Sequence, residues 1–212
     1  MKRSTDKNPV LLVHGIWDTT AIFDRVTPYL RELGWLVYSL DLIPNDSSVG
    51  LDKLAEQVAN YAEAVFGRDR PFDLVGFSMG GIVSRYYIQR LGGIERVQRF
   101  VTISSPHNGT VTAYALNLEG SLQMRPKSPF LQDLNRDAVD MLGRINFTSM
   151  WTPFDMMILP AHSSKMPVGR EIELPVLVHR WMVSDRRSLN AVARVLSEPV
   201  KNTKPAQLTP QI

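Results

Sequence analysis

The stretch that decides the fold is "FDLVGFSMGGIVSRYYIQRLGG", residues 72–93. The apolar run Phe72 to Val75 predicts a buried strand, and helical spacing over Met79 to Arg90 predicts a helix directly after it. Between them Ser78 stands in the pattern G-x-S-x-G, with glycines at 76 and 80. This context is typical of a nucleophile elbow, in which strand and helix backbones approach closely and the serine adopts strained dihedral angles. The alternative is a glycine-rich turn with an incidental serine.

On both sides of this stretch, short apolar runs alternate with helical patterns. Strands are predicted at residues 9–13, 35–40, 72–75, 97–103, 147–151 and 175–178, and helices at 23–33, 51–65, 79–90 and 188–196. Apolar runs without alternation fit strands that are buried on both faces. The order βαβαβαβ predicts a predominantly parallel sheet with helices on both faces, an α/β fold.

Length and composition favour a single domain. The chain has 212 residues, of which 44% are hydrophobic, enough for one substantial core over residues 1–198. Between residues 110 and 145 the alternation lapses, and an excursion of this length is usually functional, for example a lid or cap. Residues 199–212 contain three prolines without periodicity and are expected to be a frayed tail.

Charge and cysteine content exclude several function classes. The 24 basic and 21 acidic residues are interspersed, and a net charge of +3 argues against nucleic acid as a partner, while a transient contact with a membrane surface stays open. Without cysteine there is no disulfide, thiolate metal site or cysteine nucleophile. The basic start precedes an apolar run too short for a signal peptide, and no apolar stretch could span a bilayer. We therefore expect a cytoplasmic protein.

A serine nucleophile needs a histidine base that is oriented by a carboxylate. His179 follows the predicted strand 175–178, whose end would lie at the same sheet edge as Ser78, so it is the favoured base; His162, in a loop, is the alternative. Asp155 follows another strand and has apolar neighbours, among which an unpaired carboxylate would be costly, so it is the favoured acid. Asp133, Asp137 and Asp140 fit a solvated helix face, and Asp185 fits a cap of the last helix.

A tetrahedral intermediate also needs hydrogen-bond donors for its oxyanion. One is the backbone N–H after the nucleophile, which belongs to Met79. The loop after the first strand, "VHGIWD", is expected to supply the other from Ile16, with Gly15 allowing a close approach of the backbone.

Five segments together resemble the small bacterial triacylglycerol lipases and esterases of the α/β-hydrolase superfamily, of the lipase A type: "VLLVHGIWD", "GFSMGGIVSRYY", "ISSPHNGT", "FDMMILP" and "HRWMVSD". The resemblance implies a minimal α/β-hydrolase fold, the triad Ser78, Asp155 and His179, the oxyanion donors Ile16 and Met79, and no cofactor or metal. It makes His107 a structural loop residue. It also implies hydrolysis of carboxylic esters with medium to long acyl chains, including glycerolipids, with Trp17 contacting the substrate.

Two other functions fit the same residues. A thioesterase or acyltransferase would use the same triad, because the shape and chemistry of the pocket, and not the triad, determine which molecule accepts the acyl group. A catalytically inactive homologue would use the pocket to bind a lipid or a partner.

Overall fold

The computed structural model of the protein describes residues 7–201. Its sheet has six strands, all parallel, in the order β2-β1-β3-β4-β5-β6. The strands are β1 (Val10–Val13), β2 (Val37–Leu40), β3 (Phe72–Phe77), β4 (Val97–Ile103), β5 (Asn146–Trp151) and β6 (Arg170–Glu173). The predicted α/β architecture, a parallel sheet with helices on both faces, is confirmed.

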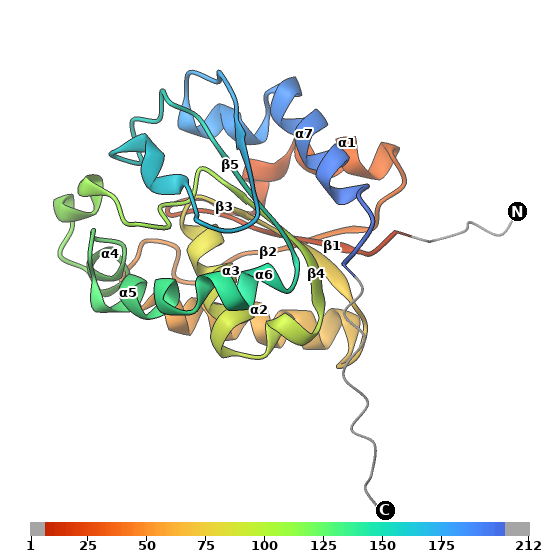
Figure 1. Cartoon of the computed structure of the whole chain (residues 1–212), viewed down its shortest axis with the longest axis horizontal. Helices are drawn as coiled ribbons and strands as arrows, with labels where there is room; N and C mark the ends of the chain where they lie inside the picture. Colours follow the sequence, from red (N-terminus) through yellow and green to blue (C-terminus); the bar gives the residue numbers. More distant parts are fainter. Residues whose placement is uncertain (1–6, 202–212) are drawn as a thin grey trace, which may run out of the picture.

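Two layers of helices enclose the sheet (Figure 1): α1 and α7 cover one face, and α2 and α3 cover the other. The helices are α1 (Val26–Glu32), α2 (Leu51–Phe66), α3 (Met79–Arg90), α4 (Glu119–Gln123), α5 (Pro129–Arg136), α6 (Ala138–Gly143) and α7 (Arg186–Leu196). Short 3-10 helices are η1 (Thr20–Phe23), η2 (Gly93–Glu95), η3 (Val111–Ala115), η4 (Ala161–Ser164) and η5 (His179–Val183).

The central strand β1 shows why its sequence is continuously apolar. All four of its residues are fully buried, and their side chains alternate between the two faces of the sheet. Leu11 and Val13 pack in the core beneath α2 and α3, whereas Val10 and Leu12 pack in the core beneath α1 and α7. A strand covered on both faces has no solvent side, so it needs no polar alternation.

The chain order creates a crevice at one edge of the sheet. From β1 the chain runs to β2 on one side and then returns to place β3 on the other. The connections that leave the carboxyl ends of β1 and β3 therefore diverge, and ligands of open α/β sheets bind at such a switch point. The loop after β1 begins at His14, and the turn after β3 contains Ser78.

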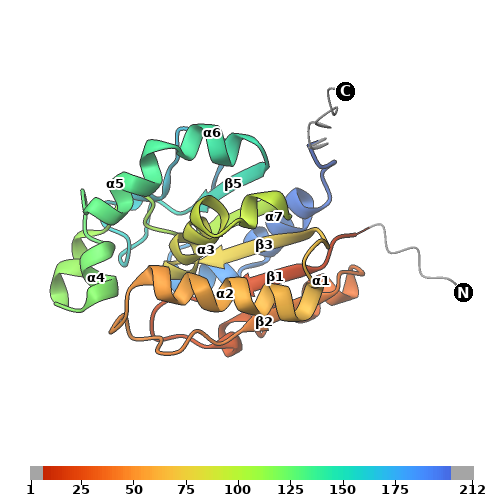
Figure 2. The same cartoon turned by 90° about the horizontal axis from the view of Figure 1, so that it is seen from below.

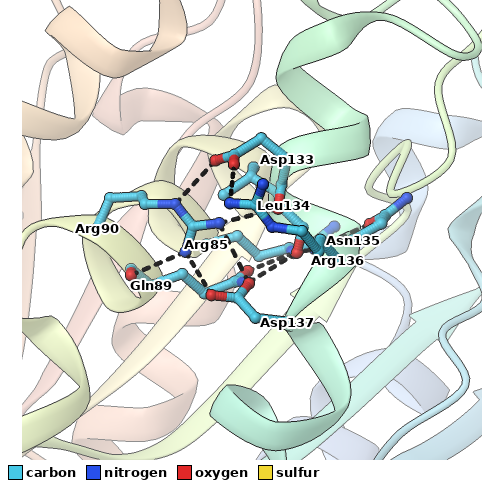
Figure 3. A network of polar contacts seen from close by, with 8 residues as sticks. All are labelled: Arg85, Gln89, Arg90, Asp133, Leu134, Asn135, Arg136 and Asp137. Atoms are coloured by element: carbon cyan, nitrogen blue, oxygen red, sulfur yellow. Dashed lines mark hydrogen bonds and ion pairs between the residues drawn. The ribbon is translucent and has the colours of Figure 1, made fainter.

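The excursion at residues 110–145 is a string of short helices, η3, α4, α5 and α6, along the side of α3 (Figure 2). Figure 3 shows the polar network that holds α5 and α6 against α3. Arg90 pairs with Asp133 at 2.8 Å and with Asp137 at 2.7 Å. Asp140 is exposed and these two carboxylates are partly exposed, as a solvated helix face requires, but the packing of α5 on α3 also brings a guanidinium to both of the latter.

Arg85 forms the buried part of this network. Its side chain is fully buried and donates to the Leu134 carbonyl and to Asn135 Oδ1, each at 2.9 Å. Burial lowers the pKa of Arg85 to about 9, a value that is still above neutral pH, so the guanidinium remains charged there. These hydrogen bonds fix the C-terminal end of α5 to α3, the helix that follows Ser78.

The last predicted strand is misplaced. Residues 175–178 form a loop, and the sixth strand is instead β6, whose sequence is charged and largely exposed. Leu174 and Val176 are buried in the core near α7, but Pro175 has no N–H for a ladder, and Val176 N–H bonds back to the Leu174 carbonyl. An edge strand needs no continuous apolar run, so its sequence resembled a loop.

The other predicted elements match observed ones with small shifts at their ends. The helix expected at 23–33 is divided into η1 and α1, and Thr19 caps η1. Asp185 caps α7 as predicted, accepting from the Arg187 N–H. Most of the expected frayed tail, from residue 202, lies outside the described residues. Within residues 7–201 every helix is too short or too polar to cross a membrane.

Candidate active site

Ser78 lies in the sharp turn between β3 and α3. Its φ of 54° and ψ of −125° are strained for a residue with a side chain. The turn is secured by a hydrogen bond from the Ser78 N–H to the Ile103 carbonyl at 2.8 Å and by another from Gly81 N–H to the Ser78 carbonyl at 3.0 Å. The conformation places the hydroxyl at the N-terminus of α3, where the helix dipole favours negative charge.

The glycines of the motif are required by close backbone contacts. A Cβ on Gly76 would collide with the backbone of Gly81, and one on Gly80 would collide with the Val13 and His14 carbonyl oxygens. On the facing loop, a Cβ on Gly15 would lie 2.9 Å from Ser78 Cβ and 3.4 Å from Ser78 Oγ. The loop after β1 therefore packs directly against the serine.

His179 and Asp155 form a buried hydrogen-bonded pair. His179 Nδ1 lies 2.8 Å from Asp155 Oδ2, while the backbone N–H groups of Met157 and Ile158 both donate to Oδ1 at 2.9 Å. Burial by itself favours the protonated acid, but the His179 hydrogen bond and charge, together with the two N–H groups, lower the pKa of Asp155. An ionised carboxylate only accepts hydrogen bonds, so Nδ1 donates and Nε2 keeps its lone pair.

The histidine lies beside the elbow, although it is not at a strand end as predicted. It is the first residue of η5, which follows the loop that replaces the predicted strand. Its ring packs on Phe77, the residue before Ser78, with ring centroids 4.9 Å apart. This contact places His179 beside the end of β3 that leads into Ser78.

The loop after β1 is held in place by two neighbours. Leu42 N–H donates to His14 Nε2 at 2.9 Å, so the His14 proton lies on Nδ1, which donates to the Gly15 carbonyl at 2.8 Å. Asn45, after β2, accepts from Trp17 N–H at 2.7 Å and donates its side-chain N–H to the Asp18 carbonyl at 2.6 Å. Ile16 thus lies on a loop of defined conformation opposite Met79, the first residue of α3, whose N–H has no acceptor within the helix.

An apolar cleft opens beside Ser78. It encloses about 520 Å³ when the solvent-filled space of its open mouth is included. Ile16, Trp17 and Met79 line it as expected, and the 110–145 excursion supplies one wall through Ala113, Leu116 and Met124, among others. Met157 and Ile158, next to Asp155, complete the lining. Trp17 stands at the mouth with 58% of its surface exposed. Movement of the excursion as a lid stays a prediction.

Sequence reasoning missed an ion pair across the crevice. Asp18 is only 7% exposed, and its Oδ1 lies 3.0 Å from the Arg180 guanidinium. Burial raises the pKa of Asp18, and the charges of Arg180, His14 and His179 oppose that rise. The pair joins the loop after β1 to the residue beside His179. No local pattern links two residues so far apart in the chain.

The remaining histidine candidates lie elsewhere. His162 lines a separate surface pocket with Lys127 and Arg136. His107 is fully buried, bonds Thr102 Oγ1 at 2.9 Å, and has its pKa lowered well below the usual value by burial and by the charge of Arg85. Within residues 7–201 no cluster of three or more His, Cys, Asp or Glu side chains is placed to hold a metal ion.

Comparisons with known proteins identify similar chains. The family model for palmitoyl protein thioesterase matches residues 9–154. The "Lysosomal thioesterase PPT2" proteins of Mus musculus and Homo sapiens are each 33% identical over 107 residues, 48% of this chain and 34% of theirs. This match spans about a third of the curated relatives' length, and because their name places them in lysosomes, the cytoplasmic location stays a prediction.

Solved structures agree on the fold. The mature lipase BlEst2 of Bacillus licheniformis has a TM-score of 0.73 at 15% identity, over 90% of this chain and 92% of its own. Aspergillus fumigatus lipase B has a TM-score of 0.74 at 17% identity, over 97% of this chain and 56% of its own. The fold is that of α/β-hydrolase lipases and esterases, whereas a specific relation to lipase A-type enzymes is not confirmed.

Proposed function

The chain belongs to the palmitoyl protein thioesterase family, a family of ester-hydrolysing enzymes on the α/β-hydrolase fold, and from this we propose that it hydrolyses long-chain acyl thioesters and esters through Ser78. The observation that carries the proposal is the strained serine of the elbow, which follows Phe77, the residue that His179 of the buried His179–Asp155 pair packs on, and which opens on an apolar cleft. The sequence alone favoured oxygen esters as substrates, and membership of this family is the reason to include thioesters.

In this mechanism Ser78 Oγ attacks the acyl carbonyl carbon and His179 Nε2 takes its proton. Asp155 holds the imidazole through Nδ1 and stabilises the imidazolium that forms. The oxyanion is stabilised by the backbone N–H groups of Ile16 and Met79. His179 then returns the proton to the leaving sulfur or oxygen as its bond to the carbonyl carbon breaks, which leaves an acyl-enzyme. Water, deprotonated by the same histidine, releases the fatty acid and Ser78.

The chemistry of the cleft supports a long acyl chain. Its lining is dominated by Ile16, Met79, Met124, Met157 and Ile158, side chains that bind an alkyl tail without hydrogen bonds. Each methylene buried there is worth about 0.8 kcal/mol. Methionine adapts its shape to flexible ligands, which suits a tail with many conformers.

The proposal is tested with a fluorophosphonate probe, which reacts readily only with an activated serine. We expect the wild-type protein to be labelled at Ser78 and to cleave S-palmitoyl N-acetylcysteamine, a small uncharged thioester. Ser78→Ala should abolish both. Ser84→Ala, on the same helix but fully buried, is the matched serine control and should keep both.

Labelling that survives Ser78→Ala would move the nucleophile to another residue. A wild-type protein that neither labels nor cleaves, yet binds palmitate, would instead indicate the inactive binding homologue.

A further inference from the structure

We propose that a second groove, on the histidine side of Trp17, binds the thiol or alcohol that leaves the substrate, and that it prefers uncharged or cationic leaving groups to phosphorylated ones. The inference rests on the proposed function, because it assigns the part of the substrate that the acyl cleft does not hold. The groove is separate from the cleft, and the residues that line it include Trp17, Asp18, Asp24, Val178, Arg180 and Trp181.

The position of the groove follows the path of the proton. The base must deliver a proton to the leaving atom, so the leaving group has to lie on the side of the crevice that carries His179. Val178 and Arg180, the residues on either side of His179, both line the groove, and neither lines the acyl cleft. Trp17 borders both spaces and separates them. A thioester bound with its acyl chain in the cleft therefore directs its thiol past Trp17 into the groove.

The floor of the groove reaches the nucleophile. Asp18 Oδ2 and Ser78 Oγ both lie within 3.5 Å of a single point, the position that a Cβ on Gly15 would occupy. The Asp18–Arg180 ion pair, with N and O 3.0 Å apart, closes this floor and joins its two sides. The thiol or alcohol that leaves the acyl carbon above Ser78 is therefore next to Asp18 and Arg180, the residues at the bottom of the groove.

The walls indicate which leaving groups fit. Trp17 and Trp181 are 58% and 54% exposed, a large aromatic surface for side chains of this size. Indole faces attract cations and stack on flat or apolar groups. The charged side chains that line the groove are two carboxylates, Asp18 and Asp24, and one guanidinium, Arg180, which is already paired with Asp18.

These three groups sum to one negative charge, and the Arg180 guanidinium is paired with Asp18 through one nitrogen. A thiol that carries several phosphates would be repelled by Asp24 and would have to compete with Asp18 for Arg180, whereas a neutral or cationic thiol would meet indole rings and a carboxylate. The expected ligand class is therefore a thiol or alcohol without phosphate, such as a cysteine-containing peptide of neutral or positive charge.

The test separates acylation from deacylation, because the leaving group has departed before water attacks. Single-turnover kinetics are measured with S-palmitoyl cysteine peptides of equal length that carry two lysines or two glutamates. We expect faster acylation with the lysine peptide and one common deacylation rate. Trp181→Ala should slow acylation by the lysine peptide about two- to fivefold and leave deacylation unchanged. Asp24→Asn should reduce the preference between the peptides about two- to threefold.

Leu116→Ala, in the acyl cleft, is the matched control and should affect both peptides equally. Equal acylation of the two peptides by the wild type, or a Trp181→Ala effect that also appears in deacylation, would overturn the groove assignment while hydrolysis itself persists. Loss of the proposed function has a different signature: no thioester is cleaved and Ser78 is not labelled.

Discussion

His179 Nδ1 and Asp155 Oδ2 lie 2.8 Å apart although 24 residues separate them in the chain. Asp155 is in the loop after β5, and His179 begins η5 after the loop that follows β6. Both loops leave the carboxyl edge of the parallel sheet, the edge where β3 turns at Ser78. The relationship explains how segments that are distant in the chain can come together at one edge of the sheet.

His179→Ala and Asp155→Asn should each reduce turnover about a thousandfold or more while the fold is retained, because the serine loses its base or the base loses its orientation. His162→Ala is the matched histidine control and should be nearly silent, since His162 lines a different pocket. The measurement is kcat with a palmitoyl thioester, accompanied by circular dichroism. The reverse ranking would make His162 the base.

Gly15→Ala should abolish most activity without unfolding the protein. The added methyl would lie 2.9 Å from Ser78 Cβ, closer than carbon atoms pack, so the oxyanion loop or the elbow has to shift. Gly143→Ala, where the nearest atom is 3.9 Å away, is the matched control and should behave as wild type. Thermal unfolding and probe labelling of both variants check this, and a fully active Gly15→Ala would place the oxyanion donors elsewhere.

p-Nitrophenyl esters of about eight carbons or longer should be cleaved at least as well as acetate, because each buried methylene adds about 0.8 kcal/mol. Ala113→Phe should reverse this order, since the ring would fill the cleft that Ala113 lines. Ala64→Phe, on an exposed position of α2, controls for the added ring. A kcat/KM that declines steadily from acetate upward in the wild type would indicate a short-chain esterase.

Acid should remove the stabilisation that Asp155 provides. Its pKa is lowered in the folded protein, so above the ordinary carboxyl range the folded state gains from the ionised group, and this gain is lost as the pH falls through the lowered pKa. The difference in unfolding free energy between wild type and Asp155→Asn should therefore be largest near neutral pH and shrink below about pH 4. Urea titrations across this range provide the test, and a difference independent of pH would mean that the carboxylate is not ionised when paired.

Arg90→Ala should loosen α5 and α6 from α3 and cost about 2 kcal/mol, since it breaks the charge-assisted hydrogen bonds to Asp133 and Asp137 that Figure 3 shows. Amide hydrogen exchange should accelerate in residues 129–143 before it does so elsewhere. Arg68→Ala, which removes an exposed pair with Glu63, is the matched control and should change neither stability nor exchange there. Unchanged exchange in Arg90→Ala would show that apolar packing alone holds these helices.

Much of the fold could be predicted because its signals are local. The span of α3, Met79 to Arg90, and that of β4, Val97 to Ile103, agree with the observed elements, because most of their residues are buried and the apolar pattern that burial requires is local. The elbow was recognisable for the same reason: Gly76 and Gly80 stand within two residues of Ser78, where any side chain would collide.

The features that could not be predicted from the sequence depend on contacts between segments that are distant in the chain. The edge strand β6 has no apolar run because only one neighbour pairs with it, so its register on β5 came from the tertiary structure alone. The Asp18–Arg180 pair, the Arg90 contacts with Asp133 and Asp137, and the division of the crevice by Trp17 also arise only when loops from different strands meet. Local propensity is set by a residue and its near neighbours along the chain, whereas the energy of a buried charge is set by whichever group the fold brings beside it.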